Sequence, residues 1–311
     1  MPRRFRFGIC TDQGMDWETT VKRWQLFERL GFESAWLCDH LIYVSHPDQP
    51  YFEAWTLLAA LAARTERIRI GVLVSSNTFR HPSVLAKEAA TVDNISNGRL
   101  EVGLGAGWYA PEHAMFGIPF PETRELVTRF KEAVQVIDLM LRQDVSSFDG
   151  EYYQLRGAQS RPHPVQKPRP PLVLAGFGPR MLKIIARYAD TWNAFGSPKE
   201  MRERNQMLDS YCHEIGRDPD TLDRSLYFWV PTAESDPWVS EQAFHDVIGP
   251  YIEAGVNQFI FDQPPEAQNA MLERIATEVL PRLQQQTPRE VASVAASQID
   301  TSDWTKPEDY I

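Results

Sequence analysis

Asp39 and His40 stand side by side directly after residues 34–38, a short apolar run that is typical of a strand. A carboxylate beside an imidazole can orient the ring and stabilise its charged form, and an imidazole exchanges protons near neutral pH. The pair therefore indicates acid–base chemistry at a strand end. The spacing also allows a simpler interpretation, in which the aspartate caps a loop and the histidine is only exposed.

Small polar side chains follow the next apolar run, at Ser75, Ser76 and Asn77. Hydroxyl and amide groups on a tight loop between a strand and a helix can bind the edge of a ligand ring. The same groups can instead satisfy the backbone of their own loop. We take the three residues as candidate ligand-binding residues.

A glycine-rich run contains Gly105 and Gly107 and ends at Trp108. Glycines let a strand bend and let another group approach the backbone closely. A flat aromatic ligand above the two glycines, walled by Trp108, would use that space. The run lacks the GxGxxG spacing of a dinucleotide site, and we expect no helix from residues 109–111.

The segment Gly176-Phe177-Gly178 leads into a helix that begins at Pro179. Free backbone N–H groups and the helix dipole make such a helix start a site for phosphate. A plain turn with proline at the first helical position is the alternative. We favour the phosphate site.

Polar and aromatic residues also stand near other strand ends, at Asn193, Tyr43 and Trp229. They predict a partly apolar pocket. The seven histidines and three cysteines show no metal-binding spacing, so we expect no metal site. No Walker loop, GxSxG elbow or Cys–His signature is present.

The elements that must position these residues alternate between short strands and longer helices. Eight strand–helix units predict a single (β/α)8 barrel over residues 1–283, against a doubly wound open sheet as the alternative. An insertion at about 144–171 precedes the fifth strand, and 284–311 form a polar tail. The expected strands span residues 5–11, 34–38, 68–74, 100–104, 172–175, 191–194, 226–230 and 258–261. In a barrel the loops after the strands meet at one face, where we expect the site.

Composition excludes several classes of protein. The 42 acidic and 32 basic residues give a formal charge of −10, which argues against a nucleic-acid or anionic-membrane binder. The longest apolar stretch is far shorter than a bilayer-spanning helix, and the basic N-terminus lacks the apolar run of a signal peptide. Three cysteines form no disulfide framework, so we expect a cytoplasmic protein.

The motifs resemble those of the bacterial luciferase-like superfamily, which comprises flavin-dependent monooxygenases and oxidoreductases that use the deazaflavin coenzyme F420. The resemblance covers about residues 5–283. The similar segments are 30–36 leading to Asp39-His40, 69–71, 80–82, 96–108, 175–178 and 186–193.

The resemblance implies a barrel with an insertion before the fifth strand and a flavin-type ring across its mouth. It implies a non-prolyl cis peptide at Leu73-Val74 or the adjacent bond, close to the ring. The loop after the fifth strand would hold the cofactor phosphate, and His40 would be the acid or base. Some deazaflavin dehydrogenases carry a glutamate where this chain has Trp108, so the resemblance does not identify the substrate.

By this resemblance we expect an F420-dependent oxidoreductase that transfers a hydride to or from a small organic substrate. One alternative is an FMN monooxygenase that takes reduced flavin from a separate reductase, and another is a flavin-binding barrel without turnover. Family members are often dimers, so a homodimer is one implied arrangement. An oligoglutamate tail on the deazaflavin would favour nearby basic residues, with the candidates Arg161, Lys167, Arg169, Arg180 and Lys183.

Overall fold

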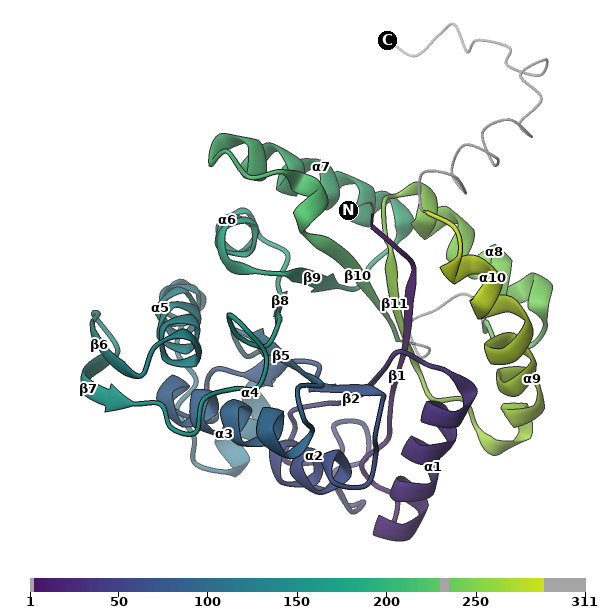
Figure 1. The fold of residues 1–311 in the computed structure, drawn as a ribbon, viewed down its shortest axis with the longest axis horizontal. Coiled ribbons are helices and arrows are strands. Elements are labelled where there is room, and N and C mark those ends of the chain that lie inside the picture. The colour runs from purple at the N-terminus through teal and green to yellow at the C-terminus, as the bar shows by residue number, and fades with distance from the viewer. Residues whose placement is uncertain (1–2, 230–234, 288–311) are drawn as a thin grey trace, which may run out of the picture.

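A closed barrel of parallel strands is the centre of the computed structural model, which describes residues 3–229 and 235–287 (Figure 1). Most of the predicted tail, 288–311, lies outside the described residues. β3 pairs with both β2 and β5, and β1 with both β2 and β11, so the sheet closes on itself. The barrel strands are β1 (Arg6–Cys10), β2 (Ser34–Leu37), β3 (Arg69–Val72), β5 (Leu100–Gly105), β8 (Leu172–Ala175), β9 (Thr191–Ala194), β10 (Asp223–Phe228) and β11 (Gln258–Asp262). A two-residue strand, β4 (Ser75–Ser76), extends β3 and pairs with the end of β5.

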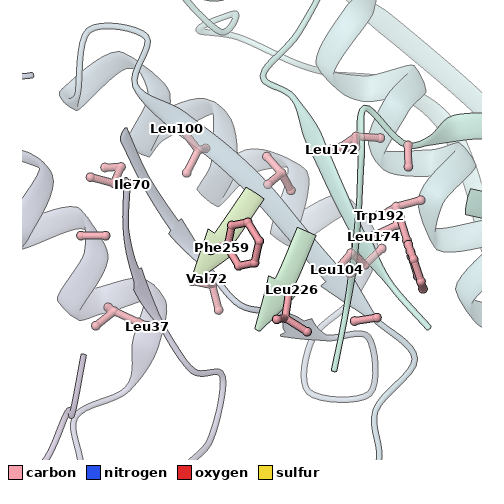
Figure 2. Close-up of a cluster of buried hydrophobic side chains, with 14 of the residues drawn as sticks. Leu37, Ile70, Val72, Leu100, Leu104, Leu172, Leu174, Trp192, Leu226 and Phe259 are labelled. Carbon is pink, nitrogen blue, oxygen red and sulfur yellow. The ribbon is translucent and has the colours of Figure 1, made fainter. Parts of the chain in front are cut away.

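Strand alternation explains why these segments form a barrel with a helical coat. In β5, Leu100, Val102 and Leu104 belong to the large apolar cluster between strands and helices, part of which Figure 2 shows. The alternate residues, Glu101 and Gly103 among them, therefore face the barrel interior. The expected (β/α)8 barrel is confirmed, and the open sheet is not what the chain forms.

Helices surround the barrel, as Figure 1 shows. Local signals define their ends. Asp16 caps the first helix by accepting from the Thr19 amide, and Gly31 ends that helix in the left-handed region at φ 85°. The helices are α1 (Trp17–Leu30), α2 (Ala54–Ala62), α3 (Pro82–Ile95), α4 (Ala110–Met115), α5 (Thr123–Arg142), α6 (Pro179–Tyr188), α7 (Pro198–Glu214), α8 (Glu241–Glu253), α9 (Asn269–Arg274) and α10 (Leu280–Gln284).

The insertion between α5 and β8 contains an antiparallel hairpin, β6 (Val145–Asp149) with β7 (Gln154–Gln159). A proline-rich segment with two cis X-Pro bonds, at 161–162 and 167–168, returns the chain to the barrel. Figure 1 shows the hairpin outside the ring of strands, beside α5. It therefore lies away from the barrel interior.

A buried ion network closes the end of the barrel where the strands begin. Glu101 is fully buried and accepts hydrogen bonds from Arg6 and Arg69. These two guanidiniums outweigh the cost of burial and lower the pKa of Glu101. The network joins β1, β3 and β5 at the face opposite the loops that follow the strands.

Several strand bounds differ from the sequence-based expectation, most of all those of the seventh barrel strand. It spans Asp223–Phe228 rather than 226–230, because its first three residues, Asp223, Arg224 and Ser225, are polar and hide its start. The helical segment after β11 is divided into α9, a π-helical turn over Ile275–Val279 and α10, where Pro281 lies in the first turn.

Candidate active site at the barrel mouth

His40 lies just beyond β2, and the carboxylate against its ring belongs to Glu112. The distance from His40 Nδ1 to Glu112 Oε2 is 2.9 Å, and the Glu112 side chain is fully buried. Since an ionised carboxylate only accepts hydrogen bonds, Nδ1 of His40 carries a proton and Nε2 is the other functional position of the ring. The ring is thus held by a buried anion, as an acid–base histidine requires.

Glu112 also fixes the loop that carries His40. Its Oε1 accepts hydrogen bonds from the backbone amides of Leu41 and Ile42. Burial would raise the pKa of Glu112, but these amides and His40 overcome that effect and lower it. The carboxylate therefore stays ionised at pH values below the ordinary pKa of a glutamate.

The expectation that no helix follows the glycine-rich run is wrong, and for that reason Glu112 was missed. Residues Ala110–Met115 form α4, with Pro111 at its start. Proline in the first turn followed by glutamate is a helix-start signal that was available in the sequence.

Asp39 does not contact the His40 ring in the way the sequence suggested. Its buried carboxylate accepts hydrogen bonds from both terminal nitrogens of Arg80, at 2.6 and 3.1 Å, and from the Ser76 amide at 2.7 Å. Burial raises the pKa of Asp39 against the opposing effect of these donors. Adjacent residues at a strand end point in different directions, so Asp39 joins the β2 loop to the β4 loop while His40 turns to α4.

A second histidine of α4 fixes the loop after β4. His113 is buried, and its Nδ1 donates to the Tyr109 carbonyl oxygen at 2.8 Å. Nε2 then accepts from the Thr78 hydroxyl at 2.6 Å, and Ser76 donates to Thr78 at 2.7 Å. Glu112 and His113 thus connect one short helix to two loops of the mouth.

The three polar residues predicted after the third strand separate in space. The Ser75 hydroxyl accepts from the Trp55 indole of α2 and is turned away from the mouth. Ser76 belongs to the His113 network. Asn77 donates from its amide to the Tyr153 hydroxyl at 3.3 Å, while its buried Oδ1 has no partner among the described residues. That oxygen is a candidate acceptor for a ligand.

Leu73 and Val74 lie at the top of the barrel interior, in a cluster with Cys10, Trp36 and Ile260. The peptide bond between Leu73 and Val74 is cis, at the position that the family resemblance implied.

The glycines of β5 make room for this segment of the chain itself. A Cβ at Gly103 would lie 1.9 Å from the Val72 carbonyl oxygen, and one at Gly105 would lie 2.8 Å from Val74 Cγ2. At Gly107, where φ is +94°, a Cβ would meet the Thr78 hydroxyl at 2.7 Å. The close approach expected at Gly105 and Gly107 is therefore that of the neighbouring strand and loop, and no ligand is needed to explain it.

Aromatic rings surround His40. The centroid of Trp108 lies 5.8 Å from that of His40 at 90°, and Tyr109 lies 6.4 Å away at 81°. Trp108 is 63% exposed and Trp229, one residue beyond β10, is 41% exposed. Large apolar side chains with this exposure at a barrel mouth are suited to contact a ligand.

A polar group of residues beside this aromatic wall was not identified from the sequence. Tyr227 donates to Asp262 Oδ1 at 2.6 Å, and Tyr51 donates to Gln13 Oε1 at 3.0 Å. The thiols of Cys10 and Cys38 lie 3.5 Å apart between the ends of β1 and β2. Tyr43, predicted as a pocket residue, packs edge-on against Tyr51 at 5.8 Å.

The predicted phosphate site lies between β8 and α6. Gly178 is the N-cap of α6, without a side-chain capping bond in the described structure, and the first turn contains no acidic residue. Phe177 packs on Phe195 at 4.7 Å and beneath the Arg204 guanidinium. Asn193, at the inner face of β9, donates to Ser225 at 2.9 Å.

Of the five basic residues considered for a cofactor tail, only Arg180 follows a barrel strand at this face. Arg169 and Lys167 precede β8 and so lie toward the opposite end, where Arg169 is bonded to Asp138 and Asp190. Arg161 belongs to the insertion and pairs with Asp144. Lys183 lies in the second turn of α6, over the Tyr211 ring. Sequence proximity to β8 was misleading because the two ends of a strand are at opposite faces.

Within residues 3–229 and 235–287, no group of three histidine, cysteine, aspartate or glutamate side chains is arranged to hold a metal ion. No helix in that part of the chain has the length and apolar character to cross a membrane.

Comparisons with known proteins agree with this architecture. The F420-dependent glucose-6-phosphate dehydrogenase of Amycolatopsis mediterranei (strain U-32) is 27% identical over 314 residues, covering 82% of this chain and 91% of that protein. The protein of the same name from Kineococcus radiotolerans (strain ATCC BAA-149 / DSM 14245 / SRS30216) is 29% identical over 307 residues, covering 82% and 90%.

Among solved structures, an F420-dependent secondary alcohol dehydrogenase in complex with an F420-acetone adduct superimposes with a TM-score of 0.79. It is 21% identical, and the match covers 90% of this chain and 99% of that one. The long-chain alkane monooxygenase LadA gives a TM-score of 0.76 at 14% identity, over 94% and 96%. These structures show the shared fold.

The family model described as luciferase-like monooxygenase matches residues 4–301. This match confirms the family resemblance and the expectation of an oxidoreductase that were drawn from the sequence motifs. Since it extends over nearly the whole chain, the protein belongs to the luciferase-like monooxygenase family.

Proposed function

We propose that this enzyme binds coenzyme F420 at the barrel mouth and transfers a hydride between that cofactor and a small organic substrate. The observation that carries the proposal is the pair formed by His40 and the buried Glu112, 2.9 Å apart at the end of β2. Relatives named F420-dependent glucose-6-phosphate dehydrogenases align with most of the chain and support the choice of cofactor.

The residues at the mouth fit a ligand with a polar ring edge and a phosphate. The unpartnered Oδ1 of Asn77 offers a buried acceptor beside β4. The start of α6 offers backbone N–H groups, and open space surrounds Gly178. We assign the ring to the segment around Leu73, Val74, Ser76 and Asn77, with Trp108 and Asn193 as further contacts, and the phosphate to Gly176, Phe177 and Gly178.

F420, when bound, supplies a ring that accepts or donates a hydride. The protein supplies the accompanying proton transfer. His40 donates from Nδ1 to Glu112, so the lone pair of a neutral His40 is at Nε2, where it takes the proton of a substrate hydroxyl. In the reverse direction the protonated ring returns that proton to a carbonyl oxygen. Positioned acid–base groups of this kind contribute about 10²–10⁴-fold to a rate.

The placement of the basic residues favours a second candidate function, an FMN monooxygenase supplied with reduced flavin by a separate reductase. Arg161, Lys167 and Arg169 are all bonded away from the mouth, so they offer nothing to an oligoglutamate tail. FMN has the phosphate but lacks that tail. We place this candidate second because the first aligned relatives bear F420-dependent names.

An oxygen-free assay separates the two functions. The protein is mixed anaerobically with F420 and a panel of secondary alcohols, or with reduced F420 and the matching ketones, and the cofactor absorbance is followed. Hydride transfer predicts a change in cofactor redox state without oxygen. Consumption of oxygen with reduced FMN, together with no change of F420 under any condition, would establish the monooxygenase instead.

A further inference from the structure

The loops that form one half of the barrel mouth contain no lysine or arginine. The strands β10, β11, β1 and β2 are neighbours in the barrel. The described residues that follow them, 229, 235–240, 263–268, 11–16 and 38–53, contain neither residue type. Their only basic side chains are those of His40 and His46. Four adjacent loops without a fixed positive charge make this half of the mouth distinct.

The surface of this half consists of neutral hydroxyl groups, aromatic rings and carboxylates. The Tyr227 and Tyr51 hydroxyls are hydrogen-bonded to Asp262 and Gln13, at 2.6 and 3.0 Å. Tyr43 packs on Tyr51, and Asp12 accepts from the Gly14 amide at 2.7 Å. These groups can bind a polar, uncharged ligand, and none of them carries a positive charge that would balance an anion.

The pKa values of two tyrosines report the charges in this half of the mouth. Burial, and then the charges of Asp12 and Asp262, raise the pKa of Tyr43. Burial, followed by Cys10, Cys38 and Asp262, raises the pKa of Tyr227. Both hydroxyls therefore remain protonated at neutral pH, and the carboxylates of Asp12 and Asp262 are the nearby charges that act there at that pH.

Arginines on the elements packed against this half are already paired with carboxylates of its loops. Arg23 of α1 reaches the loop after β11, where it is bonded to Glu266 at 2.9 Å and to Asn269 at 3.0 Å. Arg80, after β4, is bonded to Asp39 and Glu53 and pairs with Glu88 at 3.5 Å. A ligand anion would have to compete with these carboxylates.

The other half of the mouth has the opposite character. Arg180, Lys199 and Arg204 follow β8 and β9, and the uncapped start of α6 lies with them. Anions are bound in proteins by such guanidinium, ammonium and backbone N–H groups. The phosphate of a cofactor therefore has a place on this side.

We infer that the substrate is an uncharged organic molecule with an apolar or aromatic body, and that phosphate esters and carboxylates are excluded from the half-mouth formed by β10, β11, β1 and β2. The inference rests on the proposed function, because it names the substrate class of that same site. An anion there would lose its hydration without gaining a cation, which is costly in a partly buried site. The inferred substrate class also differs from glucose 6-phosphate, the substrate for which several relatives are named.

Matched ligand pairs test the inference on the F420-loaded protein. 1-Phenylethanol and mandelate differ by a methyl group against a carboxylate, and glucose and glucose 6-phosphate differ by the phosphate. Binding is measured by perturbation of the cofactor spectrum and tryptophan fluorescence, so turnover is not needed. We expect 1-phenylethanol to bind at least about tenfold more tightly than mandelate, and glucose 6-phosphate to bind no better than glucose. Tighter binding of either anion than of its neutral partner overturns the inference.

A charge variant adds a second readout. Asp12→Asn keeps a side-chain oxygen for the Gly14 amide but removes a negative charge, so the preference for 1-phenylethanol over mandelate should fall several-fold. Asp48→Asn, on the exposed part of the β2 loop, is the matched control and should leave that preference unchanged. Equal preferences in Asp12→Asn and the wild type would contradict the electrostatic explanation. If F420 itself fails to bind, the proposed function fails; if F420 binds and the anions are preferred, only this inference fails.

Discussion

His40 depends on the carboxylate that holds its ring. The sequence identified the histidine from its place after a strand but assigned the supporting carboxylate to Asp39, its neighbour in the chain. In the structure that contact comes from Glu112, 72 residues later, and Asp39 is bonded to Arg80 and Ser76. A contact between distant residues of two loops depends on tertiary packing, which residue spacing does not encode.

His40→Ala should reduce kcat by about 10²–10⁴-fold, because it removes the group that moves the proton. The affinity for F420 should change by less than about threefold, since the phosphate site lies on the other side of the mouth. Steady-state kinetics and a cofactor titration measure the two effects. His46→Ala, in the exposed part of the same loop, is the control and should behave as wild type. Unchanged kcat in His40→Ala would show that His40 is not the group that moves the proton.

Glu112→Gln should loosen the β2 loop as well as lower kcat. The neutral amide accepts less strongly from the backbone amides of Leu41 and Ile42, so we expect their hydrogen exchange to become faster. Hydrogen–deuterium exchange with mass spectrometry measures this. Glu125→Gln, which removes a surface pair with Arg129 on α5, should leave exchange of the loop unaltered. Equal protection of residues 41 and 42 in both variants would show that Glu112 does not hold the loop.

At the scale of elements, strand periodicity and capping residues were sufficient to predict most of the barrel. The strands 172–175 and 191–194 have the predicted bounds. The short α4 was missed because six residues give little periodic signal, although Pro111 in its first turn is a helix-start signal. The role of the β5 glycines also required the structure, since their close neighbours come from β3 and the β4 loop.

Gly103→Ala should destabilise the barrel severely. Its Cβ would overlap the carbonyl oxygen of Val72, a backbone atom that moves only if two paired strands separate, so we expect a loss of at least about 3 kcal/mol. Gly249→Ala is the matched control. It lies inside α8 with open space around its Cβ, and it should stabilise the protein by about 0.5–1 kcal/mol. Denaturant unfolding measures both changes, and a stable Gly103→Ala protein would refute the packing described here.

At the scale of the whole molecule, one end of the barrel has a structural role and the other a functional role. The end where the strands begin is closed by Arg6, Glu101 and Arg69, and the other end carries the site. The net charge of −10 is unfavourable for an anionic cofactor. The proposed phosphate site lies in the half of the mouth with basic residues and the α6 start, which is separate from the half without them.

The barrel should lose stability in acid through Glu101. Because the pKa of Glu101 is lowered in the folded state, its contribution is complete above the ordinary value of 4.5 and is lost as the pH falls below it. Glu101→Gln should therefore lower the free energy of unfolding by about 3 kcal/mol at pH 7, with a smaller difference from wild type at pH 3. Unfolding curves at the two pH values measure this. Glu278→Gln on the surface is the control, and a difference independent of pH would contradict the ionised network.

Equilibrium titration of the apoprotein with F420 and with FMN, each oxidised and reduced, tests whether the mouth is an F420 site. We predict saturable binding of F420, with FMN weaker by at least about tenfold. Tight binding of FMN without any response to F420 would contradict the assignment of F420 as the cofactor and establish the enzyme as a flavin monooxygenase.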